Sequence, residues 1–84
     1  MEAQLREVLA DTARLAVPID TLALDTDLHA SGLSSMATVN VMLGIEEKFD
    51  IEFPENLLKR ETFQSIRSLL QVVCSLQQKQ EETA

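Results

Sequence analysis

The feature that most constrains the fold is an apolar run from Ala37 to Phe49 that directly follows the sequence Gly32-Leu33-Ser34-Ser35-Met36. The run predicts a helix over residues 35–49 that is entered from a polar loop. Ser34 is a good N-cap, because its hydroxyl can accept a hydrogen bond from an N–H group of the first turn. Ser35 would then lie in that turn, where free N–H groups and the positive end of the helix dipole favour an attached phosphate. From these residues alone, helix capping is a sufficient role for both serines, and modification of Ser35 is the alternative.

This predicted helix has two apolar faces. With successive residues placed about 100° apart, one face ends in an aromatic residue and is typical of a core-facing stripe; it holds Thr38, Val41, Met42, Ile45 and Phe49. The nearly opposite face holds Met36, Val39 and Leu43, with Asn40 and Glu47 beside them. Such a helix is either buried all round or uses its second face to bind a partner. A chain of 84 residues has few elements with which to surround a helix, which favours partner binding.

The flanking segments predict two further long helices. An amphipathic helix is predicted from Ala3 to Leu15, ended by Pro18, because apolar positions recur at helical spacing at Leu5, Val8, Leu9, Thr12 and Ala16. A last helix, capped by Thr62, is predicted from a second such stripe, with Cys74 buried beside it: Phe63, Ile66, Leu69, Leu70 and Val73.

Between these helices the sequence predicts a long loop, a connector and one short helix. The loop over residues 17–34 carries scattered apolar anchors and one turn of helix around Asp27 to Ala30, and Gly32 would supply an unusual backbone angle. The connector over 50–54 is anchored by Ile51 and Phe53, and residues 55–60 read as a short helix with acid at its start and base at its end.

The predicted fold class is therefore all-α, a small four-helix bundle of three longer helices and one short one. Two glycines and two prolines are too few for the turns of an all-β domain. The domain is expected to cover residues 1–76, and the polar tail 77–84 is expected to fray or be disordered.

Composition and residue spacing exclude several functions. The formal charge of −7 disfavours nucleic acid and anionic membranes as partners, and no apolar run approaches the roughly 20 residues that span a bilayer. One cysteine can form neither an internal disulfide nor a zinc site, and the polar start of the chain lacks a secretory signal, so a cytoplasmic protein is expected.

The sequence offers no recognisable catalytic or metal-binding pattern. His29 has no nucleophile at a recognisable spacing and is interpreted as a surface loop residue without a role. Asp20, Asp25 and Asp27 lack the calcium-loop pattern. Neither an enzyme nor a metal site is predicted.

An acidic region surrounds the end of the central helix. It comprises Glu46, Glu47, Asp50, Glu52 and Glu55. These residues form either a solvated face or, beside the second apolar stripe, a docking surface for a basic partner.

The arrangement resembles the acyl carrier protein family, the four-helix domains that bear phosphopantetheine. The resemblance extends from Leu5 to about Leu76. It rests on Asp27-Leu28, Gly32-Leu33-Ser34-Ser35-Met36, Gly44-Ile45-Glu46-Glu47-Lys48-Phe49, Asp50-Ile51-Glu52-Phe53-Pro54 and Thr62-Phe63. The family's attachment motif is Gly-x-Asp-Ser-Leu, which aligns its modified serine with Ser35. Here Ser34 replaces the aspartate and Met36 the leucine, and both replacements keep a short polar cap and an exposed apolar anchor.

Within that family the sequence looks like the stand-alone bacterial aminoacyl carrier proteins, which are charged by seryl-tRNA-synthetase-like amino acid:[carrier protein] ligases. The resemblance implies 4'-phosphopantetheine attached to Ser35 by a phosphopantetheinyl transferase, carrying glycine or alanine as a thioester. It implies that Met36, Val39 and Leu43, flanked by Asn40 and Glu47, dock on the ligase. The short helix that holds Asn56, Leu57 and Lys59 would border the path of the arm. The carrier would be a monomer without catalytic residues.

Two other functions fit the same residues. One is a conventional acyl or peptidyl carrier for fatty-acid, polyketide or nonribosomal peptide synthesis. The other is an unmodified acidic helical adaptor that binds a partner through the same apolar stripe.

Overall fold

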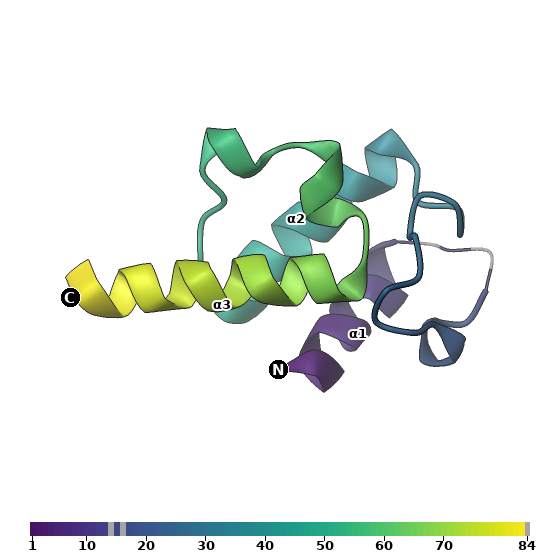
Figure 1. Cartoon of the computed structure of the whole chain (residues 1–84), viewed down its shortest axis with the longest axis horizontal. Helices are drawn as coiled ribbons and strands as arrows, with labels where there is room; N and C mark the ends of the chain where they lie inside the picture. Colours follow the sequence, from purple (N-terminus) through teal and green to yellow (C-terminus); the bar gives the residue numbers. More distant parts are fainter. Residues whose placement is uncertain (14, 16, 84) are drawn as a thin grey trace.

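The described part of the chain folds into three α-helices and three short 3₁₀ helices (Figure 1). The structure is a computed structural model that describes residues 1–13, 15 and 17–83; Ala16 and Ala84, which the sequence assigned to the first helix and the tail, lie outside them. The α-helices are α1 (Glu2–Thr12), α2 (Ser35–Phe49) and α3 (Ile66–Thr83). The 3₁₀ helices are η1 (Ile19–Thr21), η2 (Glu55–Leu57) and η3 (Arg60–Phe63). The predicted all-α class, with a long loop between the first two long helices, is confirmed.

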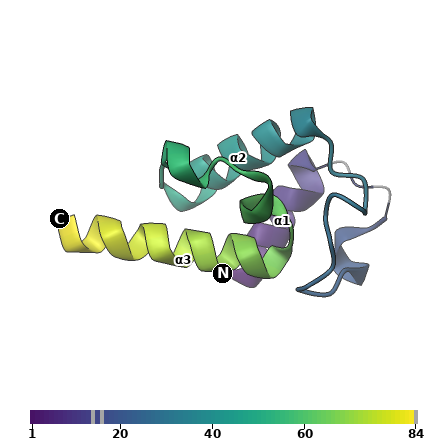
Figure 2. The ribbon, with the colours of Figure 1, turned by 45° about the horizontal axis from the view of Figure 1, so that its top comes forward.

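One core joins the three α-helices. α1 packs against both α2 and α3, and η3 packs against α3. Figure 2 shows the η3 turn between α2 and the start of α3. Each α-helix contributes fully buried side chains, namely Leu5, Leu9, Val41, Ile45, Ile66, Leu69 and Val73. The stripe predicted for the first helix, from Leu5 to Leu9, therefore does face the core.

α1 ends at Thr12, three residues before the predicted end at Leu15. The chain turns back after this point, so that η1 packs against α1. The Arg6 guanidinium donates a hydrogen bond of 2.8 Å to the Ile19 carbonyl oxygen across this turn. This bond holds η1 against α1, so the chain leaves the helix before Pro18.

α2 begins and ends at the predicted residues. Gly32 has a φ of 113°, the positive angle expected of it. At the other end Asp50 is left-handed, with φ 53° and ψ 52°, and its N–H donates to the Glu46 carbonyl oxygen. The predicted core-facing stripe is buried at Val41 and Ile45 and half-buried at its other members, Thr38, Met42 and Phe49.

The chain after α2 follows the predicted connector but not the predicted short helix. Ile51 and Phe53 are buried, and the rings of Phe53 and Phe63 stack with centroids 5.7 Å apart. Instead of one helix over 55–60, the structure has η2 and η3 separated by Leu58 and Lys59, and Lys59 is extended at φ −139° and ψ 162°. This extended residue lets the chain turn back and place Phe63 against Phe53.

The last helix also differs from its prediction in two details. Thr62 is a buried residue of η3 rather than a cap. Ser65 and Ser68 exchange bonds instead: the Ser68 N–H donates to Ser65 Oγ at 3.1 Å and the Ser65 N–H to Ser68 Oγ at 3.0 Å, a reciprocal arrangement like a capping box. Cys74, predicted to be buried, is exposed, because it lies about 100° round the helix from the buried Val73.

The long loop is fixed to the start of α3. The Leu28 N–H donates to the Gln64 carbonyl oxygen at 2.7 Å, and the Arg67 N–H to the Leu24 carbonyl oxygen at 3.0 Å. The Arg67 guanidinium also donates to the Asp25 carboxylate at 2.6 Å, and this hydrogen bond and the carboxylate's charge raise the pKa of Arg67. The predicted helical turn near Asp27 is present as a bond of 3.1 Å from the Ser31 N–H to the Asp27 carbonyl oxygen.

At the other end of the chain, α3 extends through residue 83. The fraying of residues 77–84 stays a prediction. Within the described residues, no helix is both long and apolar enough to cross a membrane.

Candidate functional site

The two serines at the start of α2 have different environments. Ser34 is the N-cap, with extended backbone, and its Oγ accepts a hydrogen bond of 3.1 Å from the Ala37 N–H. Ser35 is the first residue of the helix, and its side chain is exposed. Among the described residues, none hydrogen-bonds the Ser35 hydroxyl. One hydroxyl is thus used in capping, and its neighbour is free for chemistry at the positive end of the helix dipole.

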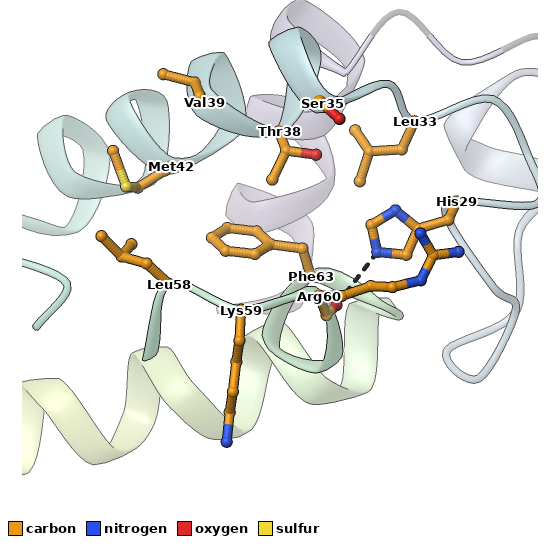
Figure 3. Close-up of a pocket in the computed structure, with 10 residues that line it drawn as sticks. All are labelled: His29, Leu33, Ser35, Thr38, Val39, Met42, Leu58, Lys59, Arg60 and Phe63. Carbon is orange, nitrogen blue, oxygen red and sulfur yellow. Dashed lines mark hydrogen bonds between the residues drawn. The ribbon is translucent and has the colours of Figure 1, made fainter. Parts of the chain in front are cut away.

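A groove with a volume of about 410 Å³ lies directly beside Ser35 (Figure 3). One wall is α2, and the other is the segment from Leu58 to Phe63. Its apolar lining consists of Leu33, Val39, Met42, Leu58 and Phe63. Its polar lining consists of His29, Ser35, Thr38, Lys59 and Arg60. The family resemblance implied that the segment holding Lys59 borders the path of the arm, but the sequence did not predict the groove, because the turn of η3 that closes it leaves no periodic signal.

His29 is not the loop residue without a role that the sequence suggested. It is half-buried, lines the groove, and its Nε2 lies 3.2 Å from the Arg60 carbonyl oxygen. The Asp27 carboxylate holds the preceding turn by accepting from the His29 N–H at 2.9 Å and the Ala30 N–H at 3.2 Å. His29 therefore ties the loop before Ser35 to the opposite wall of the groove.

The second apolar face of α2 is exposed. Met36 is 79% exposed, Val39 51% and Leu43 53%, with Asn40 and Glu47 exposed beside them. Leu58, which the sequence did not single out, is 49% exposed across the groove from Val39 and extends this apolar surface. The face is available to a partner, as its spacing indicated.

The predicted residues of the 55–60 segment are not equally available. Asn56 and Lys59 are exposed, whereas Leu57 is half-buried and packs against the core.

In the acidic region near the end of α2, Glu46 stabilises the connector, because its carboxylate accepts a hydrogen bond of 2.8 Å from the Phe53 N–H. Glu47, Glu52 and Glu55 are exposed and keep the region negative.

No cluster of three or more potential metal-ligating side chains occurs among the residues that the structure describes. Two members of the acidic trio in the loop have other partners: Asp25 pairs with Arg67, and Asp27 caps the turn at His29. Asp25 and Asp27 therefore stabilise the conformation of the loop.

Comparison with known proteins identifies the class. Residues 3–73 match the family model described as a phosphopantetheine attachment site. The chain belongs to this family of phosphopantetheine-binding carrier proteins, which confirms the predicted cofactor and the prediction that the protein is not an enzyme.

The similarities narrow the class further. The chain is 56% identical over 69 residues to the aminoacyl carrier protein of Agrobacterium fabrum, an alignment that covers 82% of this chain and 83% of the relative. A second match is a chain in the crystal structure of an engineered Bradyrhizobium japonicum glycine:[carrier protein] ligase with a carrier protein from Agrobacterium tumefaciens and AMP. The two chains superpose with a TM-score of 0.86 and 54% sequence identity, over 88% of this chain and 99% of that one. A structure of the B. japonicum ligase with glycylated carrier protein matches with a TM-score of 0.71 and 30% identity, over 83% and 93% of the two chains. Within the carrier family, this protein is an aminoacyl carrier protein.

The residues at the start of α2 fit a covalently attached phosphopantetheine. The attachment needs an exposed hydroxyl, which Ser35 offers without first breaking a bond inside the protein. The phosphodiester would lie where the helix dipole favours negative charge. A groove for the rest of the group begins at the same residue.

Proposed function

We propose that Ser35 is the residue that carries 4'-phosphopantetheine, attached by a phosphopantetheinyl transferase, and that a glycine:[carrier protein] ligase loads the group. The bound group supplies a terminal thiol on which an aminoacyl group is held as a thioester. The contrast between Ser34 and Ser35 carries the proposal: both residues are exposed, but the Ser34 hydroxyl accepts from the Ala37 N–H, whereas the Ser35 hydroxyl has no hydrogen bond to the described residues. The chain itself holds Ser35 in a fixed position, because Ser34 caps the helix that begins at Ser35 and Gly32 sets the direction in which the loop enters that helix.

Glycine is the proposed cargo, because two similar solved structures contain glycine:[carrier protein] ligases, one with a glycylated carrier. Met36, Val39, Leu43 and the neighbouring Asn40 and Glu47 are proposed as the surface that meets the ligase, since they form one exposed face that begins next to Ser35. Asn56 and Lys59 are proposed to border the path of the arm. The cytoplasmic location expected from the sequence is part of this proposal, as is a monomeric carrier.

Intact-mass measurement tests the attachment. The chain is co-expressed with a phosphopantetheinyl transferase, together with Ser35→Ala and the matched control Ser34→Ala. The parent and Ser34→Ala proteins are expected to gain the pantetheinyl mass, and Ser35→Ala is expected to stay unmodified. Modification of Ser35→Ala, or no gain in the parent while another carrier is modified in parallel, contradicts the proposal.

A charging assay tests the cargo. The modified protein is incubated with ligase, ATP and single amino acids, and the aminoacylated mass is recorded. Glycine is expected to be loaded in preference to larger amino acids. Preferential loading of another amino acid contradicts the assignment of glycine while leaving Ser35 as the carrier residue.

A further inference from the structure

We propose that Leu58 and Lys59 form a second contact surface for the ligase, and that Lys59 binds a carboxylate of the ligase there. This surface lies across the groove from the exposed stripe of Met36, Val39 and Leu43 (the α2 stripe). The inference rests on the proposed loading by a glycine:[carrier protein] ligase. It assigns Lys59 to protein binding, in addition to its proposed place beside the arm.

Lys59 is a cation without a partner inside the described part of the protein. Other described cations form ion pairs with carboxylates, at N–O distances of 2.9, 3.7 and 2.6 Å: Arg6 with Glu2, Lys48 with Glu7 and Arg67 with Asp25. Neither Lys59 nor Arg60 has such a partner among the described residues, although the chain carries 14 acidic and 7 basic residues. The Lys59 ammonium group is therefore free to bind a carboxylate of another protein.

Lys59 and Arg60 point in different directions. In Figure 3 the Arg60 side chain extends beside the His29 ring at the Ser35 end of the groove, whereas the Lys59 side chain points away from the groove. Arg60 thus lies beside the proposed attachment point. Lys59 is the one of the two that an approaching protein contacts without entering the groove.

Leu58 places an apolar side chain next to this cation. It is 49% exposed, close to the 51% of Val39, and the two residues line opposite walls of the groove. Covering apolar surface that is in water is favourable, so a protein that covers the α2 stripe gains further by extending over Leu58. The contact then reaches Lys59, the next residue in the chain.

The backbone at Lys59 is fixed before any partner binds. The Lys59 carbonyl oxygen accepts a hydrogen bond of 3.2 Å from the Thr62 N–H. The carbonyl oxygen of the next residue, Arg60, lies 3.2 Å from His29 Nε2. A partner therefore orders few backbone groups when it binds here, which lowers the entropic cost of the contact.

The charge at Lys59 is opposite to the charge near the C-terminal end of α2, where Glu47, Glu52 and Glu55 are exposed. A ligase that removes water from Lys59 must supply an anion to it, because an unpaired buried charge is costly. A wholly basic ligase surface would suit the three glutamates but would be repelled at Lys59. The inferred ligase surface therefore carries charges of both signs, and their order fixes the orientation in which it docks.

The experiment separates contact with the chain from contact with the arm. The modified parent is first charged with glycine by the ligase, so that failure of this step contradicts the proposed function and not this inference. The Ser35→Ala chain, shown by intact mass to carry no arm, is then titrated with the ligase. Changes in its backbone amide NMR signals locate the contact and give a dissociation constant.

The amide signals of Leu58 and Lys59 are expected to change together with those of the α2 stripe. In the Ser35→Ala background, Lys59→Glu is expected to raise the dissociation constant about tenfold, through repulsion by the ligase carboxylate, and Lys59→Gln to raise it roughly threefold. Lys48→Glu is the matched control, because it changes the net charge equally but alters a cation that already pairs with Glu7. It is not expected to raise the constant.

Several outcomes overturn the proposal. They are the absence of measurable binding by the Ser35→Ala chain, unchanged signals at Leu58 and Lys59, and an equal rise in the dissociation constant for Lys59→Glu and Lys48→Glu. A further one is a Lys59→Glu variant that is charged slowly once modified but binds the ligase with an unchanged dissociation constant, since Lys59 would then act on the arm alone.

Discussion

Gly44 of α2 lies so close to Val8 of α1 that a Cβ atom added at Gly44 would be 2.9 Å from Val8 Cγ1. A second methyl, Thr12 Cγ2, would be 3.2 Å away. Both neighbours are β-branched and stiff at χ1, and Val8 is buried. The glycine is therefore the residue that allows the two helices to approach.

Gly44→Ala is expected to destabilise the protein. Overpacking costs roughly 1–3 kcal/mol and exceeds the gain of up to about 1 kcal/mol that alanine brings to a helix interior. Denaturant unfolding of Gly44→Ala, Val8→Ala and the double variant measures the coupling. The cost of Gly44→Ala is expected to shrink when Val8 is already alanine. An equal cost in both backgrounds would show that the Val8 contact is not its source.

Ser34→Ala is expected to lower the free energy of unfolding by about 1 kcal/mol through loss of the N-cap. Ser34→Asp keeps an acceptor for the Ala37 N–H and places a negative charge at the helix N-terminus, which adds roughly 0.3–1 kcal/mol. The expected order of stability is Asp, Ser, Ala, determined by urea unfolding. An alanine variant as stable as the parent would mean that the 3.1 Å bond to Ser34 Oγ is not a stabilising cap.

Met36→Asp is expected to slow ligase charging by roughly tenfold or more, the loss typical of an apolar anchor at an interface. Met36 is 79% exposed, so the substitution should leave the helical circular dichroism spectrum unchanged. Val17→Asp is the matched control, because Val17 is also an exposed apolar residue, at 42%, but lies outside the stripe on α2. Equal charging rates for the two variants would remove Met36 from the docking surface.

Cys74 is expected to react with a thiol reagent in the folded protein before an arm is attached, since it is exposed on α3. Cys74→Ser should change the free energy of unfolding by no more than about 0.5 kcal/mol, as for other surface substitutions. The measurement is the rate of thiol modification with and without denaturant. Reaction only on unfolding would instead indicate a buried thiol.

The part of the fold that the sequence predicts best is the part with the longest uninterrupted signal. α2 carries a cap, a continuous apolar run and a glycine before its first turn, and its bounds at Ser35 and Phe49 are those predicted. The exposure of Met36, Val39 and Leu43 follows from the same periodicity, because one face of the helix is already committed to the core.

The parts that were missed depend on tertiary packing. Phe63 continues the apolar spacing of α3, yet it lies in η3, since a side chain can face the same core from a turn as from a helix. Cys74 has apolar neighbours in sequence but lies off the buried stripe of Leu69, Val73 and Leu76. The groove joins His29 to Arg60 across 31 positions of sequence, a pairing that no local pattern encodes.

Both glycines of the chain act on α2. Gly32 sets the direction from which the loop enters the helix, and Gly44 sets how closely α1 approaches it. Neither belongs to the outward face of Met36, Val39 and Leu43. We therefore expect placement and recognition to be encoded by separate residues. A carrier engineered for a different ligase could then have its outer face changed while these two glycines keep the proposed attachment point where it is.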